Sequence, residues 1–184
     1  MFGRPHTLGN VAPAMHQGAS LAQFTAWVGA NFDPSLTWKD LDWVRARWKG
    51  RLVIKGVLDR EDAIAAVDSG IDGLVVSNHG GRQLDGASSS IKILPEIVDA
   101  VGGRTSVLMD SGIRSGLDVV RAMACGADGV LIGRAWAYAL AARGGVGVAK
   151  VLELIRHEMQ VAMALTGVRD IASIDRSILA DLKA

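Results

Sequence analysis

The sequence predicts an α/β fold in which parallel strands alternate with helices. Four short apolar runs are expected to form the strands, at residues 52–54, 73–76, 106–109 and 129–132. Each run is continuously apolar rather than alternating, which is typical of parallel strands that are buried on both faces. Segments with helical periodicity separate the runs, and strand–helix alternation of this kind indicates a parallel sheet.

An internal repeat supports this alternation. The strands start at intervals of roughly two dozen residues, except where a long glycine-rich loop follows the second strand. Residues 70–77 and 126–133 also resemble each other, because each contains a glycine that ends a helix, a tight turn and a buried strand. The similarity also fits the ordinary turn chemistry of α/β folds. Four such units make either half of an eight-stranded barrel or a small open sheet, and composition does not decide between them.

The helix boundaries follow from capping residues. A first helix is expected to begin at Thr37, with Asp40 in the capping-box position. Asp59 is expected to cap the second helix, and Pro95 is suited to the first turn of the third. Two further helices are expected at about 117–125 and 146–166.

Residues 1–36 differ from the rest of the chain. They hold three of the four prolines and show no sustained period, so they are expected to be irregular, with at most one short helix near residues 21–28. The predicted organisation is an irregular segment at 1–36, followed by an α/β region at 37–184.

Composition restricts the class of protein. With 49% hydrophobic residues and a formal net charge of +1, the chain has a globular composition and no nucleic-acid footprint. Cys125 is the only cysteine, so neither an intrachain disulfide nor a thiolate metal cluster can form, and a reducing compartment such as the cytoplasm is expected. No run of about 18 apolar residues is present, so no membrane-spanning segment is expected.

A loop with catalytic potential follows the second strand, at residues 77–85. His79 can take up and return a proton near neutral pH, and the planar guanidinium of Arg82 can bind a carboxylate through two hydrogen bonds. Two glycines between them let the backbone turn sharply and approach a ligand. A proton acceptor beside a carboxylate-binding arginine is what the oxidation of a 2-hydroxy acid requires. Taken alone, these residues also fit a polar loop with an incidental histidine.

Ligand-binding residues are also expected after the other strands, because function in a parallel αβ barrel lies beyond the carboxyl ends of the strands. Lys55 follows the first strand and can place a positive charge beside a ligand, although a solvated lysine fits that position better when it is taken alone. Small residues at 110–116 precede a helix and can offer backbone N–H groups to an anion. Gly133 and Arg134, after the fourth strand, fit a phosphate site.

Together these positions resemble the FMN-dependent 2-hydroxy-acid dehydrogenase and oxidase family. The resemblance rests on residues 54–56, the run SNHGGRQLDG at 77–86, residues 110–116, and the pair 133–134. Within the family, the chain is most similar to the bacterial respiratory L-lactate dehydrogenase branch, through residues 3–6, 31–34, 38–41 and 158–167. The mandelate and glycolate enzymes share the core motifs and remain alternatives.

The resemblance implies a fold and a role for each motif. The family's fold is a (β/α)₈ barrel, of which the chain matches only the C-terminal half, strands five to eight. His79 would be the catalytic base and Asp110 its partner. Arg82 would bind the substrate carboxylate, and Lys55 would lie beside N1 and the C2 carbonyl of the flavin. The FMN ribityl and phosphate would be held by Asp110, Ser111, Gly112, Ile113, Arg114, Gly133 and Arg134. No metal would be needed, since the flavin carries the redox chemistry.

The resemblance also implies a substrate and partners. A full-length protein would oxidise a small 2-hydroxy acid, most simply L-lactate to pyruvate, and pass the electrons to a quinone. The base would remove either the carbon-bound proton or the hydroxyl proton with hydride transfer, and the choice between dehydrogenase and oxidase stays open as well. The family's first half, which supplies a substrate-contacting tyrosine, has no counterpart in this sequence, so a truncation or fragment is expected. Residues 1–36 would be the tail of an insertion that contacts the inner face of the membrane in some members.

Two other interpretations fit parts of the chain. Residues 110–134 also resemble the phosphate-binding stretch of IMP dehydrogenase-like barrels, but those use a catalytic cysteine on a loop, whereas Cys125 falls within a predicted helix. The second interpretation is a homo-oligomeric half-barrel that self-associates through its open sheet edges, or binds phosphate, without turnover.

Overall fold

The computed structural model describes residues 20–180, and the chain divides into one unit at 1–37 and another at 38–184. In the first unit the structure describes helix α1 (Leu21–Ala30), which lies where a short helix was expected. Ser20 caps α1 through a capping box, in which its hydroxyl accepts from the Gln23 N–H and the Gln23 side chain accepts from the Ser20 N–H. The remainder of the expected irregular segment lies largely outside the described residues.

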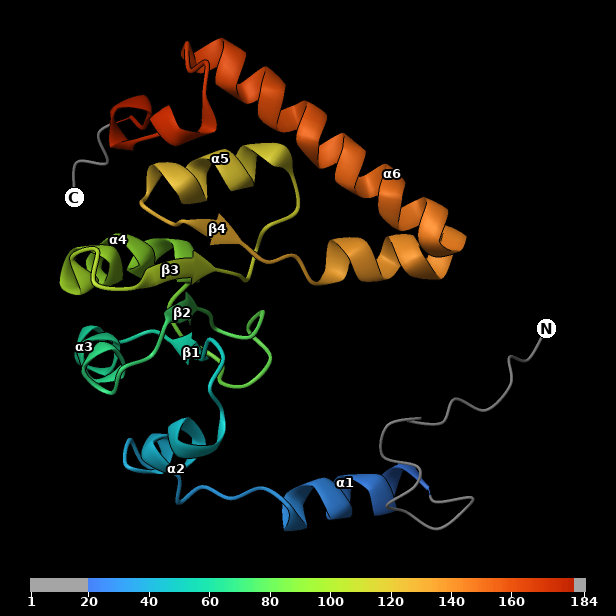
Figure 1. Cartoon of the computed structure of the whole chain (residues 1–184). Helices are drawn as coiled ribbons and strands as arrows, with labels where there is room; N and C mark the ends of the chain where they lie inside the picture. The colour runs from blue at the N-terminus through green and yellow to red at the C-terminus, as the bar shows by residue number, and fades with distance from the viewer. Residues whose placement is uncertain (1–19, 181–184) are drawn as a thin grey trace. The chain divides into compact units, whose positions relative to one another are not determined.

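The second unit is built on a four-stranded parallel sheet with the strand order β1-β2-β3-β4 (Figure 1). The strands are β1 (Val53–Val57), β2 (Gly73–Val76), β3 (Ser106–Met109) and β4 (Gly129–Val130). Each strand pairs in parallel with the next one along the chain. The predicted parallel α/β fold is therefore confirmed, although β4 is two residues long and does not extend to Ile132 as expected.

Helices connect successive strands and pack against the sheet. They are α3 (Arg60–Asp68), α4 (Ser90–Val101) and α5 (Gly116–Ala124), with α2 (Asp40–Arg47) before β1 and α6 (Arg134–Thr166) after β4. Two short 3₁₀ helices, η2 (Ile171–Ser173) and η3 (Arg176–Ile178), follow α6. The core lies between the sheet and the helices, and its fully buried large side chains include Leu74, Val76, Leu94, Ile97 and Val101. No helix among residues 20–180 is both long enough and apolar enough to cross a membrane.

The starts of two helices differ from the expectations. Helix α2 begins at Asp40, so its N-cap is Lys39 rather than Thr37, and Lys39 makes no side-chain capping bond. Helix α4 begins at Ser90, so Pro95 lies inside the helix rather than in its first turn. Burial explains the longer α4, because Ser90 is fully enclosed and the apolar residues that follow supply a continuous core face. Asp59, by contrast, caps α3 as predicted by accepting from two backbone N–H groups.

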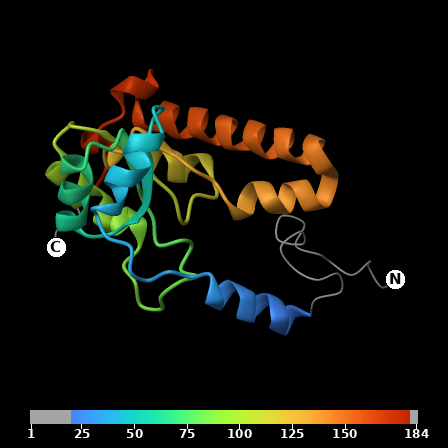
Figure 2. The ribbon, with the colours of Figure 1, turned by 60° about the horizontal axis from the view of Figure 1, so that its bottom comes forward.

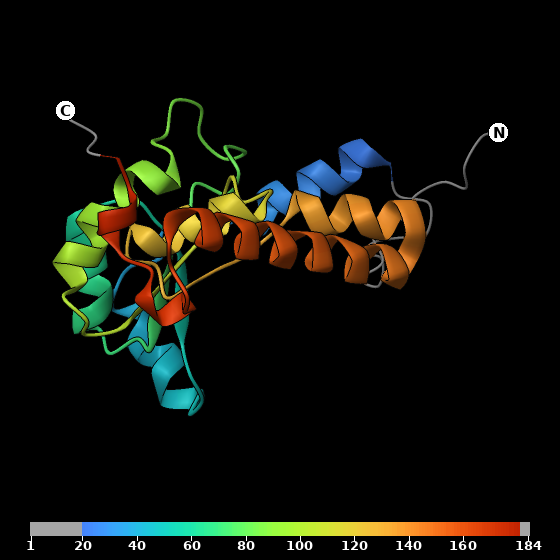
Figure 3. The ribbon, with the colours of Figure 1, turned by 90° about the horizontal axis from the view of Figure 1, so that it is seen from above.

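The last helix is also longer than expected, and it is bent. Helix α6 starts at Arg134 instead of about Val146, and non-helical backbone angles at Arg143 and Gly144 divide it into two pieces. The second piece turns back at this bend (Figures 2 and 3), and the two pieces diverge away from it (Figure 1). They approach closely at Gly147, where a Cβ atom would come within 2.2 Å of the Ala139 carbonyl oxygen. The first piece brings its N-terminus to the carboxyl end of β4.

The repeat seen in the sequence has a structural cause. Asp72 and Asp128 occupy equivalent turns, just before β2 and β4. Asp72 Oδ2 accepts from the Leu52 N–H at 2.7 Å, and Asp128 Oδ2 accepts from the Val107 N–H at 2.8 Å. The Asp72 N–H also donates to the Leu52 carbonyl oxygen, and the Asp128 N–H donates to the Val107 carbonyl oxygen, both at 2.8 Å. Each aspartate thus joins neighbouring strands at their amino ends, opposite the edge where ligands are expected.

Candidate active site

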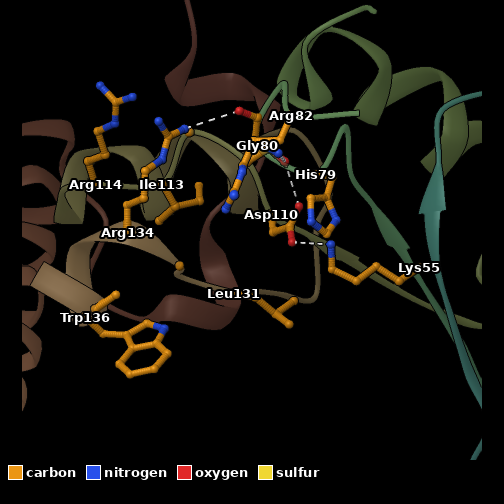
Figure 4. Close-up of a pocket in the computed structure, with 14 residues that line it drawn as sticks. Lys55, His79, Gly80, Arg82, Asp110, Ile113, Arg114, Leu131, Arg134 and Trp136 are labelled. Carbon is orange, nitrogen blue, oxygen red and sulfur yellow. Dashed lines mark hydrogen bonds and ion pairs between the residues drawn. The ribbon is translucent and has the colours of Figure 1, made fainter. Parts of the chain in front are cut away.

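One cavity lies where the segments at the carboxyl ends of the strands meet (Figure 4). It has a volume of about 400 Å³ and is lined by Lys55, His79, Gly80, Arg82, Asp110, Ser111, Gly112, Ile113, Arg114, Leu131, Gly133, Arg134, Trp136 and Ala137. Every site residue expected from the sequence is among them. The motifs, which are separated along the chain, therefore lie together in space, because the carboxyl ends of parallel strands meet at the same edge of the sheet.

A β-bulge brings Lys55 to this cavity. Lys55 pairs with Val75 of β2, but the next pairing joins Val57 to Val76, which leaves Gly56 as an extra residue in β1. Gly56 has a φ of +103°, which glycine adopts without a steric penalty. The sequence had suggested that Lys55 follows the first strand. Because β1 continues to Val57, Lys55 instead lies inside the strand.

Lys55 and Asp110 form an ion pair at the cavity. Lys55 Nζ lies 2.6 Å from Asp110 Oδ2 and donates to Ser77 Oγ at 2.7 Å. Ser111 Oγ donates to the other carboxylate oxygen of Asp110, Oδ1, at 2.8 Å. Burial by itself raises the pKa of Asp110, but hydrogen bonds from Lys55, Ser77 and Ser111 outweigh it and hold that pKa below its ordinary range. Asp110 is therefore a charged group whose two oxygens both have partners.

The expected pairing of Asp110 with His79 is corrected by these contacts, because Asp110 bonds to Lys55 and to serine hydroxyls instead. The sequence could not reveal this, since the reach of Lys55 depends on the register of three strands. Within residues 20–180, the imidazole of His79 has no hydrogen-bond or ion-pair partner, and the residue is exposed at the cavity. A general base must reach its substrate, and the open imidazole meets that requirement.

Three arginines give the cavity a positive character. In the part of the chain that the structure describes, the guanidinium groups of Arg82 and Arg114 have no carboxylate partner. Arg134 Nη2 donates only to the Gly80 carbonyl oxygen, at 3.4 Å. The one carboxylate in the lining, Asp110, is already paired with Lys55. The cavity therefore has an excess of cationic donors, which suits a ligand with more than one anionic group.

Two helix N-termini approach the cavity, and only one is open to a ligand. At α5, the Arg114 and Ser115 N–H groups donate to Asp118 Oδ2, and the Gly116 N–H donates to Glu158 Oε2 at 2.7 Å. At α6, the N-cap is Gly133, which has no side chain to cap the helix. The sequence had suggested free N–H groups before α5 as well, but side chains of Asp118 and Glu158 occupy them. An anion at the cavity would therefore meet the N-terminus of α6.

The sequence analysis missed the apolar wall of the cavity. Leu131, Trp136 and Ala137 line it, and Trp136 and Ala137 belong to the first piece of α6. Placing the start of that helix near Val146 hid them, because residues 134–142 then read as a loop. Trp136, an aromatic residue two positions after Arg134, was the available signal.

Cys125 lies outside this site. It is the C-cap of α5 and does not line the cavity, and burial raises the pKa of its thiol although the charge of Arg176 acts in the opposite direction. A thiol with a raised pKa is a poor nucleophile at neutral pH. The geometry therefore disfavours a reaction that uses a catalytic cysteine.

A parallel half-barrel with a cationic cavity at its strand ends defines the class of protein, and the chain belongs to the FMN-dependent dehydrogenase family, whose family model matches residues 2–181. The family predicted from the motifs is thereby confirmed. The chain is 66% identical to the L-lactate dehydrogenase of Caulobacter sp. strain K31 over 180 residues, which is 98% of this chain and 47% of that protein. It is 59% identical to the L-lactate dehydrogenase of Azorhizobium caulinodans over 182 residues, 99% of this chain and 48% of that protein.

Solved structures of mandelate oxidase share the fold. One superposes with a TM-score of 0.79 at 47% identity, covering 85% of this chain and 45% of that chain. Another, a complex with benzoyl-formic acid, gives a TM-score of 0.73 at 51% identity, covering 76% of this chain and 42% of that chain. The chain therefore spans about half the length of the relatives it matches, in agreement with the predicted half of a (β/α)₈ barrel.

Proposed function

We propose that the chain forms the FMN-binding, catalytic half of an L-2-hydroxy-acid dehydrogenase that converts L-lactate to pyruvate. The observation that carries the proposal is the single cavity where an open histidine, a lysine–aspartate pair and three arginines meet. L-Lactate is favoured over mandelate because the curated relatives, up to 66% identical, are L-lactate dehydrogenases, whereas the mandelate oxidase structures are 47–51% identical.

The cavity suits FMN in size and in charge. Its volume of about 400 Å³ lies within the range of small-molecule sites. The phosphate would be held by the uncapped N-terminus of α6, together with Arg134 and Arg114. Gly112 and Gly133 leave room for the ribityl chain, because a Cβ atom at either position would meet no neighbour within 4 Å. Lys55 would place its positive charge beside the ring. When bound, FMN would accept the two electrons that leave the substrate.

The substrate would be held and deprotonated by the loop after β2. Arg82 would bind the carboxylate of the 2-hydroxy acid through its two terminal nitrogens. His79 would take one proton, either from C2 or from the C2 hydroxyl, and both routes end with the loss of two protons and two electrons to give the 2-oxo acid. Asp110 would keep Lys55 in place through their ion pair rather than serve as the partner of His79. A quinone is the proposed final electron acceptor.

The His79→Gln variant tests this proposal. With FMN bound and oxygen excluded, L-lactate is expected to bleach the flavin absorbance of the wild type, while His79→Gln keeps FMN but loses about 10²-fold or more in bleaching rate. His157→Gln is the matched control, because His157 is an exposed histidine of α6 outside the cavity. Rapid bleaching in His79→Gln would refute the role given to His79, and mandelate reacting faster than L-lactate would refute the substrate.

A further inference from the structure

We propose that the Ser111 hydroxyl is a positioning group that ties the catalytic loop to the Lys55–Asp110 pair. This inference rests on the function proposed above for His79 and Arg82. Ser111 was expected only as one small residue of a flavin-binding stretch. The structure gives its side chain two specific bonds: Ser111 Oγ accepts from the Gly80 N–H at 2.9 Å and donates to Asp110 Oδ1 at 2.8 Å.

These bonds complete a closed ring of hydrogen bonds. On one side, Ser111 links the Gly80 N–H to Asp110, which is paired with Lys55. On the other side, Lys55 Nζ donates to Ser77 Oγ at 2.7 Å, and Ser77 Oγ accepts from the His79 N–H at 3.1 Å. Two consecutive N–H groups of the catalytic loop are thus held by two serine hydroxyls, with Ser77 bonded to Lys55 and Ser111 bonded to Asp110. Figure 4 shows the Lys55–Asp110 pair beside Gly80.

The backbone at Ser111 supports a role for its hydroxyl. Among residues 20–180, only His79 and Ser111 combine a side chain with a positive φ, of 55° and 72°. Every other positive φ in that range belongs to a glycine. The left-handed conformation is strained for a residue with a side chain, and glycine would avoid that strain. At this position serine differs from glycine only by its side chain. The Ser111 hydroxyl uses that difference to bond both the Gly80 N–H and the Asp110 carboxylate.

The ring explains how His79 keeps its left-handed backbone. The peptide between His79 and Gly80 is fixed at both N–H groups, and Arg134 Nη2 approaches the Gly80 carbonyl oxygen at 3.4 Å. The direction of the imidazole depends on this backbone. Arg82 lies two residues further on, so its guanidinium depends on the same anchoring. Loss of the Ser111 hydroxyl would release one N–H of the loop and remove one donor from Asp110.

Two variants separate this role from a merely structural one. Ser111→Ala removes the hydroxyl and keeps the backbone strain, whereas Ser111→Gly removes the hydroxyl and relieves the strain. The matched control is Ser89→Ala, because Ser89 is an exposed serine whose side chain makes no capping bond with α4. The first readout is amide hydrogen exchange at Gly80, measured by NMR on the 184-residue chain without flavin or substrate. It does not depend on turnover.

In both Ser111 variants the Gly80 amide is expected to exchange about fivefold faster than in the wild type, while β2 amides and the Ser89→Ala control stay unchanged. Ser111→Gly is expected to unfold no more easily than Ser111→Ala. In the FMN-bound protein at saturating FMN, the rate of flavin reduction by L-lactate should fall about tenfold in both variants. If the fall in the rate of flavin reduction followed the loss of folding stability, and was therefore smaller in Ser111→Gly than in Ser111→Ala, the role of Ser111 would be structural only.

The outcomes distinguish this inference from the proposed function. Unchanged exchange at Gly80 in both variants would overturn the positioning role, whether or not L-lactate reduces the flavin. Flavin reduction at the wild-type rate in Ser111→Gly would overturn it as well. Faster exchange at Gly80 in a chain that binds no FMN would support the ring of hydrogen bonds while refuting the function proposed for the cavity.

Discussion

At the residue scale, the arrangement of the cavity depends on the hydrogen bonds made by one partly buried carboxylate, that of Asp110. The Asp110 side chain is 17% exposed, and it receives donors from Lys55, Ser77 and Ser111. Removing one of these donors leaves part of the carboxylate desolvated without compensation, which costs more than the net strength of the bond itself. We therefore interpret the ion pair as a contact that holds Lys55 in place. Its strength should depend on pH, because it requires Asp110 to be ionised.

Acid should weaken this pair in a defined direction. The pKa of Asp110 is lower in the folded chain than in the unfolded one, so the pair contributes its full stability above the ordinary pKa of aspartate, about 3.9, and loses it as pH falls through the folded-state value. We expect Asp110→Asn to show a shallower loss of the free energy of unfolding than the wild type between about pH 5 and pH 3. Urea unfolding followed by circular dichroism measures this, and parallel curves for the two proteins would contradict it.

Much of this residue-scale picture could be predicted from the sequence. His79 and Arg82 were identifiable because their chemistry and spacing suit a base and a carboxylate-binding group, and the structure places both at the cavity. The partner of Asp110 was not identifiable, because it depends on a bulge at Gly56 and on the register of β1 against β2. The two positive φ angles outside glycine carry no sequence signal at all.

At the scale of elements, the contact between α5 and α6 leaves no room for a side chain at Gly116. A Cβ atom there would lie 2.2 Å from the Met159 backbone nitrogen and 2.3 Å from the Ile155 carbonyl oxygen. The Gly116 N–H also donates to Glu158 of α6. The first turn of α5 thus packs directly on the backbone of α6, and the two helices fix the loops that line the cavity from β3 and β4.

Gly116→Ala is therefore expected to destabilise the fold by about 1–3 kcal/mol or more, because the clashing atoms belong to a helix backbone that cannot rotate away. Gly145→Ala is the matched control, since a Cβ atom there meets nothing within 4 Å, and it should change the free energy of unfolding by no more than about 1 kcal/mol. Thermal and urea unfolding of both variants check the prediction. Equal stability of Gly116→Ala and the wild type would contradict the close packing.

Element boundaries were predictable where local chemistry decides them. Asp59 caps α3 as expected, because a carboxylate that accepts backbone N–H groups acts within one turn. Tertiary contacts mattered at α4 and α6 instead. Pro95 lies within α4 because the buried face begins earlier, and in α6 the two pieces approach each other closely at Gly147 and Ala139. Neither contact is visible in the local sequence.

At the scale of the whole molecule, the sheet ends in two strands with one neighbour each. Within residues 20–180, β1 pairs only with β2, and β4 pairs only with β3. Unpaired strand edges promote association, and Val53 of β1 is 46% exposed. The chain spans about half of the length of the relatives it matches.

We therefore expect the isolated chain to self-associate through its sheet edges. Val53→Lys should lower the oligomer fraction, because a charge on an edge strand opposes strand pairing. Val161→Lys is the matched control, since Val161 is equally exposed at 46% but lies on α6. Analytical ultracentrifugation over a range of concentrations measures the distribution. A monomer at every concentration, or equal effects of the two substitutions, would contradict the expectation.

The half-barrel was predictable because strand spacing gave the α/β alternation and the motifs gave the family, which the family match at 2–181 confirms.

The central claim, that the cavity is a flavin site, is tested most directly by titrating the chain with FMN and with riboflavin, which lacks the phosphate, and following flavin fluorescence. Saturable binding of FMN, with riboflavin bound at least about tenfold more weakly, is the predicted result, because Arg114, Arg134 and the N-terminus of α6 would recognise the phosphate. Equal affinity for the two flavins, or no saturable binding of FMN, would contradict the account.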